Sequence, residues 1–237
     1  DIHNIGAVAD NIVTGEFDLS FVQLFNFFSL FSLKRWPFAL AAFVLTLLFM
    51  AMLLSMMEKH MRVGSRSFRD LFKRIDYNLG STFFILLLAL IAYEFWALVT
   101  AGLCSLVVLI VTNGLARCIL GIALACGMMV LLCYLVSLFL LWLPCRQITG
   151  YSFMDSLSYS SQISTGKRGN IFLAVLIPYL SCSLLQGIVV TVSAFADMRP
   201  VVFLCIEIIY IFVFLYYNVL MYVLFFDANG EERLDLK

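Results

Sequence analysis

The chain has 237 residues, of which 63% are hydrophobic and 13% charged, and its formal net charge is zero. A soluble domain is about half apolar and a quarter charged, so a soluble core of this size cannot bury such an excess. A nucleic-acid-binding protein would carry a basic patch on a soluble domain, and this composition leaves no such domain. We therefore predict an integral membrane protein whose fold class is all-α, a polytopic bundle of transmembrane helices.

The first 35 residues are expected to lie outside the bilayer core. Residues 1–16 are polar, and residues 17–33 are apolar but too short for an untilted span. We predict an outer polar segment followed by an interfacial helix, together covering residues 1–35. Lys34, Arg35 and Trp36 are typical of a headgroup anchor, and Pro37 suits a first helical turn. The first span is therefore predicted over residues 37–57.

Residues 58–79 are polar and basic. Phe68, Leu71, Phe72 and Ile75 repeat at helical spacing within this segment. The pattern predicts a short amphipathic helix that lies on the membrane surface. Its charges can dock a protein partner or anionic lipid, although ordinary membrane topology also explains them. The candidate docking residues of this first elbow are Arg66, Arg69, Asp70, Lys73 and Arg74.

Residues 81–144 form a long apolar run in which Glu94 and Arg117 are the only charges. One crossing needs roughly 20 residues, so the run predicts two consecutive spans. The best turn signal is Thr112-Asn113-Gly114. A cut there gives helices of about 31 and 29 residues, which must tilt, bend or protrude. The alternative is a break at Ala101-Gly102 followed by a re-entrant segment as far as Asn113.

The remainder of the chain repeats this alternation. Residues 145–169 are polar and rich in serine, and they form a second elbow. The fourth span is predicted over 170–194, with Pro178 inside it, and the fifth over 201–226. The organisation is one membrane domain over 1–237, with the five spans between 36 and 226 and a charged tail over 227–237.

Lys and Arg are distributed unevenly between the two sides of the membrane. Four lie on one side (Lys34, Arg35, Arg117 and Arg199), and eleven on the other: Lys59, Arg62, Arg66, Arg69, Lys73, Arg74, Arg146, Lys167, Arg168, Arg233 and Lys237. The positive-inside rule places the second group, with the C-terminus, in the cytoplasm, and we expect a bacterial cytoplasmic membrane. The N-terminal residues are then outside, which predicts a further spanning helix upstream and six spans in the complete protein.

The two cytoplasmic loops share the pattern Ser-Phe-x-Asp, at Ser67–Asp70 and at Ser152–Asp155. Each serine is well placed as a helix N-cap, and each aspartate stands at the third helical position, as in a capping box. The simplest interpretation is a parallel repeat of residues 37–111 and 115–194. Chance similarity between two capped helices is the alternative.

The second elbow reads FMDSLSYSS over Phe153–Ser161 and is followed by Lys-Arg-Gly-Asn over Lys167–Asn170. Over residues 58–195 this pattern resembles poorly characterised bacterial membrane proteins, including the membrane domain associated with glycerophosphodiester phosphodiesterases. The resemblance implies spans that alternate with cytoplasmic elbows. It transfers no catalytic residue, because the soluble phosphodiesterase domain is absent from this chain.

Ionisable groups inside a membrane are costly and suggest function. Glu94 and Glu207 are predicted at similar depth, where they can face one another or pair with Arg117. One interpretation is a proton- or cation-responsive site or a polar substrate pathway, with Asn218 and Gln186 nearby. The other is that these groups fasten helices together.

Enzyme motifs are absent: the sequence has no G-x-S-x-G, no H-E-x-x-H and no phosphate-binding glycine loop. With two distant His and no paired Cys motif, we expect no catalytic residues, no metal site and no cofactor. An intramembrane lipid-modifying enzyme is the least favoured hypothesis, because no nucleophile–base pair can be named.

We therefore expect a non-enzymatic membrane subunit that assists transport or complex assembly. Its partners would be membrane lipids and either a membrane or cytoplasmic protein, for example an ATPase, or further copies of itself. Asp155, Lys167 and Arg168 are the docking candidates of the second elbow. The alternative function is a permease-like protein that moves a lipid or small solute along a pathway lined by Glu94 and Glu207.

Overall fold

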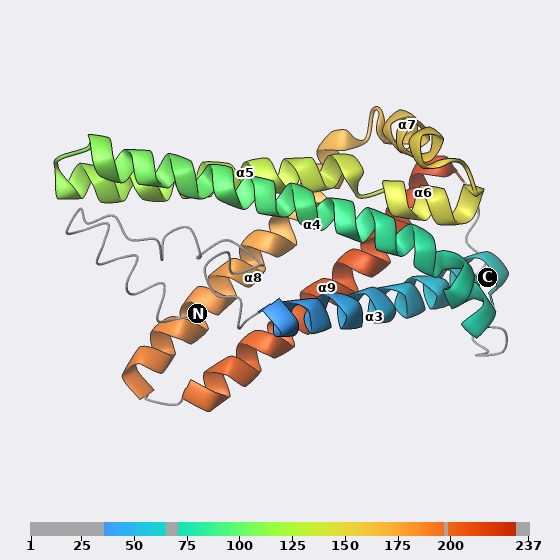
Figure 1. The fold of residues 1–237 in the computed structure, drawn as a ribbon, viewed down its shortest axis with the longest axis horizontal. Coiled ribbons are helices and arrows are strands. Elements are labelled where there is room, and N and C mark those ends of the chain that lie inside the picture. Colours follow the sequence, from blue (N-terminus) through green and yellow to red (C-terminus); the bar gives the residue numbers. More distant parts are fainter. Residues whose placement is uncertain (1–35, 65–70, 197–198, 231–237) are drawn as a thin grey trace. The chain divides into compact units, whose positions relative to one another are not determined.

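The computed structural model describes residues 36–64, 71–196 and 199–230, and every described element is a helix (Figure 1). Five stretches are long and apolar enough to cross a membrane: Trp36–Val63, Phe72–Ile110, Gly114–Thr149, Arg168–Val189 and Leu204–Asn229. The prediction of an all-α polytopic membrane protein with five spans is confirmed. The expected interfacial helix over 17–33 and the docking residues Arg66, Arg69 and Asp70 lie outside the described residues.

The first two helices extend further than the sequence predicts. Helix α3 (Trp36–Val63) ends at Gly64, whose left-handed φ of 66° suits the end of a helix. Helix α4 (Leu71–Ile110) then runs without a break for 40 residues. The prediction of a separate surface helix within 58–79 is wrong. Polar residues near 76–81 mark an edge of the apolar segment, but they include no proline, so the helix continues through them.

The turn between the second and third spans lies where the sequence predicts it. Helix α5 (Gly114–Phe139) begins directly after Asn113. The Asn113 side-chain oxygen Oδ1 accepts from the backbone N–H of Leu115 at 3.0 Å and of Ala116 at 3.4 Å. This caps the helix, since those N–H groups have no partner within the first turn. The alternative break at Ala101-Gly102 is wrong, because α4 is helical through both residues.

The second elbow contains two short helices, α6 (Trp142–Thr149) and α7 (Phe153–Ser164). Trp142, Leu143, Cys145 and Gln147 are all buried. The prediction of a polar surface segment from residue 145 is therefore wrong for α6. Ser152 caps α7, as predicted, by accepting from the backbone N–H of Asp155.

The two predicted repeat units differ at their elbows. Gly64 and Gly150 both end a helix with positive φ, of 66° and 70°. In the predicted repeat copy 37–111, the described part of the elbow is continuous with the span α4. In the copy 115–194, α7 is separate from helix α8 (Arg168–Ala196). The Ser67–Asp70 copy of the capping motif lies outside the described residues, so the duplication stays a prediction.

Contacts divide the chain into two units, the first comprising Asp1–Leu48 and Phe83–Leu132. In this unit α4 and α5 form an antiparallel hairpin (Figure 1). The Trp96 indole N–H donates to the carbonyl of Met128 at 3.0 Å, and Ala97 is fully buried beside them. About half of the side chains of the hairpin are exposed, and nearly all of those exposed are apolar, as expected of helices that face lipid.

The second unit comprises Phe49–Thr82 and Cys133–Lys237. Its most extensive helix–helix packing is between α8 and helix α9 (Arg199–Asn229), which run side by side (Figure 1). The Tyr217 hydroxyl on α9 donates to the carbonyl of Val175 on α8 at 2.7 Å. Tyr222, Phe225 and Phe226 of α9 are buried, and α6 and α7 both contact this end of α9.

Candidate functional site

The most connected polar side chains of the second unit form a buried hydrogen-bonded network. It joins four helices, and each member is at most 7% exposed. Buried polar groups are stable only when they are paired, so their convergence fixes how these helices meet. The network consists of Ser55 and Glu58 of α3, Asn78 and Thr82 of α4, Gln147 of α6 and Tyr222 of α9.

Asn78 joins α3 to α4. Its side-chain Nδ2 donates to Ser55 Oγ at 3.2 Å and to Glu58 Oε2 at 3.3 Å. The Thr82 hydroxyl donates to the backbone carbonyl of Asn78 at 2.9 Å. Within the described part of the chain, the buried Asn78 Oδ1 accepts no hydrogen bond.

Gln147 extends the network to α6 and α9. Its Nε2 donates to Thr82 Oγ1 at 3.0 Å, and its Oε1 accepts from the Tyr222 hydroxyl. Both ends of one amide are therefore used, each by a different helix. Replacing this amide by an apolar side chain leaves the buried Tyr222 hydroxyl without its partner, while the Thr82 hydroxyl keeps its bond to the Asn78 carbonyl.

The charged end of the network lies at Glu58. Its Oε1 accepts from Arg62 Nη1 at 3.0 Å and from Arg74 Nη1 at 3.5 Å. Glu58 is 22 residues beyond Trp36, which is about 33 Å along a helix at 1.5 Å per residue. The apolar core of a bilayer is about 30 Å thick, so these three groups lie at the membrane surface.

The elbow helix α7 is attached to α6 through an indole and a row of serines. The Trp142 N–H donates to the carbonyl of Phe153 at 3.1 Å and to Ser156 Oγ at 3.2 Å. Ser156, Ser160 and Ser164 are buried at four-residue spacing along α7. Their small side chains allow close approach, and each hydroxyl donates to a carbonyl of α7 itself.

The other attachment of this elbow is to the C-terminal end of α9. The Tyr159 hydroxyl donates to Asn229 Oδ1. Lys167, just after α7, donates from Nζ to Asp227 Oδ2 at 2.9 Å and to the Asp227 carbonyl at 2.8 Å. Arg168 donates to Ser161 Oγ at 3.1 Å. Two of the predicted docking cations, Lys167 and Arg168, therefore hold the elbow in place.

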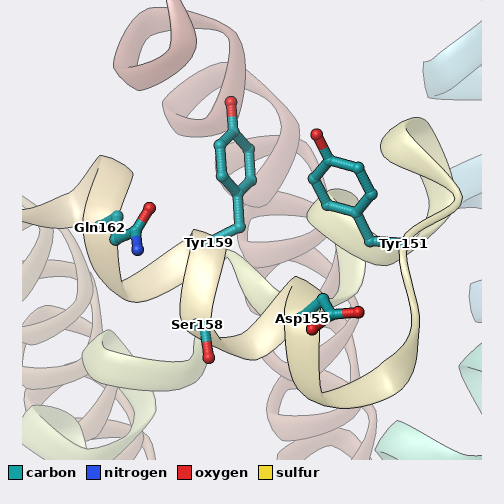
Figure 2. Close-up of a pocket in the computed structure, with 5 residues that line it drawn as sticks. All are labelled: Tyr151, Asp155, Ser158, Tyr159 and Gln162. Carbon is teal, nitrogen blue, oxygen red and sulfur yellow. The ribbon is translucent and has the colours of Figure 1, made fainter.

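The outer surface of α7 carries an open depression of about 340 Å³. Figure 2 shows Tyr151 and Tyr159 pointing to the same side of the helix. Their ring centroids are 5.6 Å apart at an interplanar angle of 90°. Asp155 takes part in the N-cap through one carboxylate oxygen, Oδ2, which accepts from the Ser152 hydroxyl. The lining consists of Tyr151, Asp155, Ser158, Tyr159 and Gln162.

The structure separates Glu94 from Arg117 within the hairpin. The Trp96–Met128 hydrogen bond sets the register, so Glu94 is level with a residue near position 130. Arg117 is about a dozen residues closer to the turn, which is about 18 Å along the helix. Its guanidinium Nε donates to the carbonyl of Val111 at 2.8 Å and so stabilises the turn. The structure does not bring the two together.

The other predicted intramembrane residues lie in the second unit. Glu207 is exposed on α9, and Gln186 is half-buried on α8. Asn218 is 2% exposed, and its Nδ2 donates to the carbonyl of Phe214 at 2.8 Å within α9. Glu94 and Glu207 belong to different units, so their pairing stays a prediction.

The network was missed because the first span was predicted to end at residue 57, which made Glu58 an ordinary loop charge. Two residue spacings in the sequence indicate parts of this network. Glu58 and Arg62 are four residues apart, as are Asn78 and Thr82, and such pairs share a helix face. No sequence pattern pointed to Gln147 or Tyr222, whose partners are 65 and 75 residues away.

Among the described residues, no group of three or more His, Cys, Asp and Glu is placed to hold a metal ion. Comparisons with known proteins give no match to a family model, a curated protein or a solved structure. The resemblance to phosphodiesterase-associated membrane domains therefore stays a prediction.

Proposed function

We propose that this chain is a non-enzymatic subunit of the bacterial cytoplasmic membrane that assists transport or complex assembly by docking a protein partner on α7. The observation that supports this proposal is that α7 is fixed by contacts along one face and leaves the opposite face exposed. Its serine face is buried against neighbouring helices, while its opposite face presents Tyr159 and Asp155, which together with Tyr151 just before the helix line an open depression.

Fixed attachment makes a good docking surface, because a surface that is already ordered loses little conformational entropy when a partner binds. Trp142 fixes the start of α7, and Tyr159 and Lys167 fix its end to α9. The helix is also capped by Ser152, so its first turn does not depend on a partner. The same arrangement serves to transmit force or position between the membrane helices and a bound protein.

The exposed face of α7 has the composition of a protein-binding surface. Tyrosine and methionine are enriched in such interfaces. Met154 is 69% exposed and Tyr151 is 48% exposed. A carboxylate between aromatic rings favours an Arg or Lys side chain of the partner, through charge and cation–π attraction. The same carboxylate disfavours an anionic lipid surface at this position, which supports a protein partner.

The orientation in this proposal comes from the distribution of Lys and Arg. The end of α3, helices α6 and α7 and the end of α9 are expected on one membrane side, because an even number of crossings separates them. That side carries the excess of cations, which favours the cytoplasm. The proposed partner is therefore cytoplasmic or a membrane protein with a cytoplasmic face.

The test is co-purification of the tagged full-length chain from native membranes in mild detergent. Ser158→Arg places a cation in the depression and is expected to abolish a stoichiometric partner that the wild-type chain retains. Asp76→Arg is the matched control, because it adds a cation to the exposed surface of α4 on the same membrane side. The proposal is wrong if the wild type carries no partner, or if Ser158→Arg retains the partner as the control does.

A further inference from the structure

We infer that Arg62 and Arg74 form a binding site for the phosphate of an anionic phospholipid headgroup. This site lies on α3 and α4 and is separate from the docking face of α7. The inference does not depend on the proposed protein partner.

The geometry places two guanidinium groups around one carboxylate oxygen. Arg62 Nη1 and Arg74 Nη1 both lie within 3.5 Å of Glu58 Oε1. Two cations held this close repel one another, and a single carboxylate neutralises only one of them. The arrangement therefore keeps an unbalanced positive charge, which a second anion would stabilise. Guanidinium groups match the geometry of phosphate and donate several hydrogen bonds to it.

The exposure of the three side chains shows where that anion would bind. Glu58 is buried, with its side chain 9% exposed, and lies on the inner side of the arginines. The side chains of Arg62 and Arg74 are 44% and 34% exposed, so part of each guanidinium faces outward. A phosphate approaching from the membrane surface meets both arginines before it meets the carboxylate.

The surroundings also match a lipid surface rather than water. Phe72 is 86% exposed and Tyr77 is 73% exposed on the first turns of α4. Aromatic side chains in this position are stabilised when they insert between lipid headgroups. Lys73, also exposed, adds a further cation between Phe72 and Arg74. The described charges that are at least partly exposed here are three cations (Arg62, Lys73, Arg74) and one anion (Asp76), while Glu58 and Lys59 are buried.

The experiment titrates the purified full-length chain in a neutral detergent with short-chain phosphatidylglycerol and counts bound lipid by native mass spectrometry. Phosphatidylcholine and inorganic phosphate are titrated in parallel. We expect saturable binding of phosphatidylglycerol, weakened about five-fold by either Arg62→Gln or Arg74→Gln, as is typical for one juxtamembrane charge. Arg146→Gln removes a cation from the other elbow and is expected to bind like the wild type.

Three results would overturn the inference. These are equal binding of phosphatidylcholine, equal occupancy by inorganic phosphate alone, or wild-type affinity in both arginine variants. Melting temperatures show whether a variant is folded. Arg74→Lys keeps a cation beside Glu58, and it is expected to bind more tightly than Arg74→Gln. A folded Arg74→Lys that binds as weakly as Arg74→Gln would also contradict a charge-driven site.

Discussion

Gln147 and Thr82, 65 residues apart in sequence, share a buried hydrogen bond of 3.0 Å from Nε2 to Oγ1. The same glutamine accepts from the Tyr222 hydroxyl, so one amide links α4, α6 and α9. α6 lies at the centre of this arrangement and also carries Trp142, which holds α7. The elbow helix α7, on which we propose docking, is thereby connected to the membrane helices through α6.

Gln147→Leu is expected to destabilise the protein by about 1–2 kcal/mol, since it leaves the buried Tyr222 hydroxyl unpaired and removes the bond that Thr82 Oγ1 accepts. Thermal unfolding in detergent measures the effect. Gln162→Leu is the matched control, because Gln162 is exposed on α7 and its replacement is expected to change stability little. Equal melting temperatures for the two variants would show that the network contributes nothing measurable.

Trp142→Phe keeps an aromatic ring but removes the N–H that donates to Phe153 and Ser156. We expect faster amide hydrogen exchange in α7, because the loss of about 1 kcal/mol of attachment raises the population of the detached helix. Exchange within the α4–α5 hairpin is the internal reference. Ser156→Ala, alone and combined with Trp142→Phe, tests whether the two residues act through one contact. Unchanged exchange in α7 would contradict the proposed attachment.

Thr112, at the hairpin turn, and Thr165, after α7, are expected on opposite sides of the membrane, because an odd number of crossings separates them. In a variant without native cysteines, Thr112→Cys should react with an impermeant maleimide in intact cells. Thr165→Cys should react only after permeabilisation. Labelling of Thr165→Cys alone in intact cells would reverse the orientation on which the docking proposal depends.

Glu94→Gln and Glu207→Gln separate the docking proposal from the alternative transport pathway. Docking on α7 predicts that both variants keep the wild-type partner, because neither glutamate is on the elbow. The control for correct insertion is the amount of folded protein recovered from membranes. If either variant is folded, keeps its partner and yet loses a transport activity of the wild type, the permease-like alternative is favoured.

Hydropathy predicted the five spans, because the cost of unpaired polar groups in lipid makes apolar length a strong constraint, and the Thr112-Asn113-Gly114 turn signal predicted where the second and third spans separate. Hydropathy failed between residues 58 and 80, where polar side chains mark a membrane boundary that α3 and α4 pass through as helices. The cap at Ser152 was predictable because its partner is three residues away. The Gln147 contacts were not, because they depend on how distant helices pack.

The depression proposed as a docking surface could be predicted only in part. Asp155 was named as a docking residue and lines the depression, but the sequence did not indicate that Tyr151 and Tyr159 would accompany it. The structure pairs Lys167 with Asp227 and Arg168 with Ser161, and the docking role of these two cations stays a prediction.

The most direct measurement is photo-crosslinking in native membranes from an unnatural amino acid at Ser158, with the same probe at Thr112 as the control. Ser158 lines the depression on α7, whereas Thr112 is expected on the opposite membrane side. We expect one dominant cross-linked protein from Ser158, lost when Tyr151→Ala is added, and none in common from Thr112. No cross-link from Ser158, or the same products from both positions, would contradict a docking function for α7.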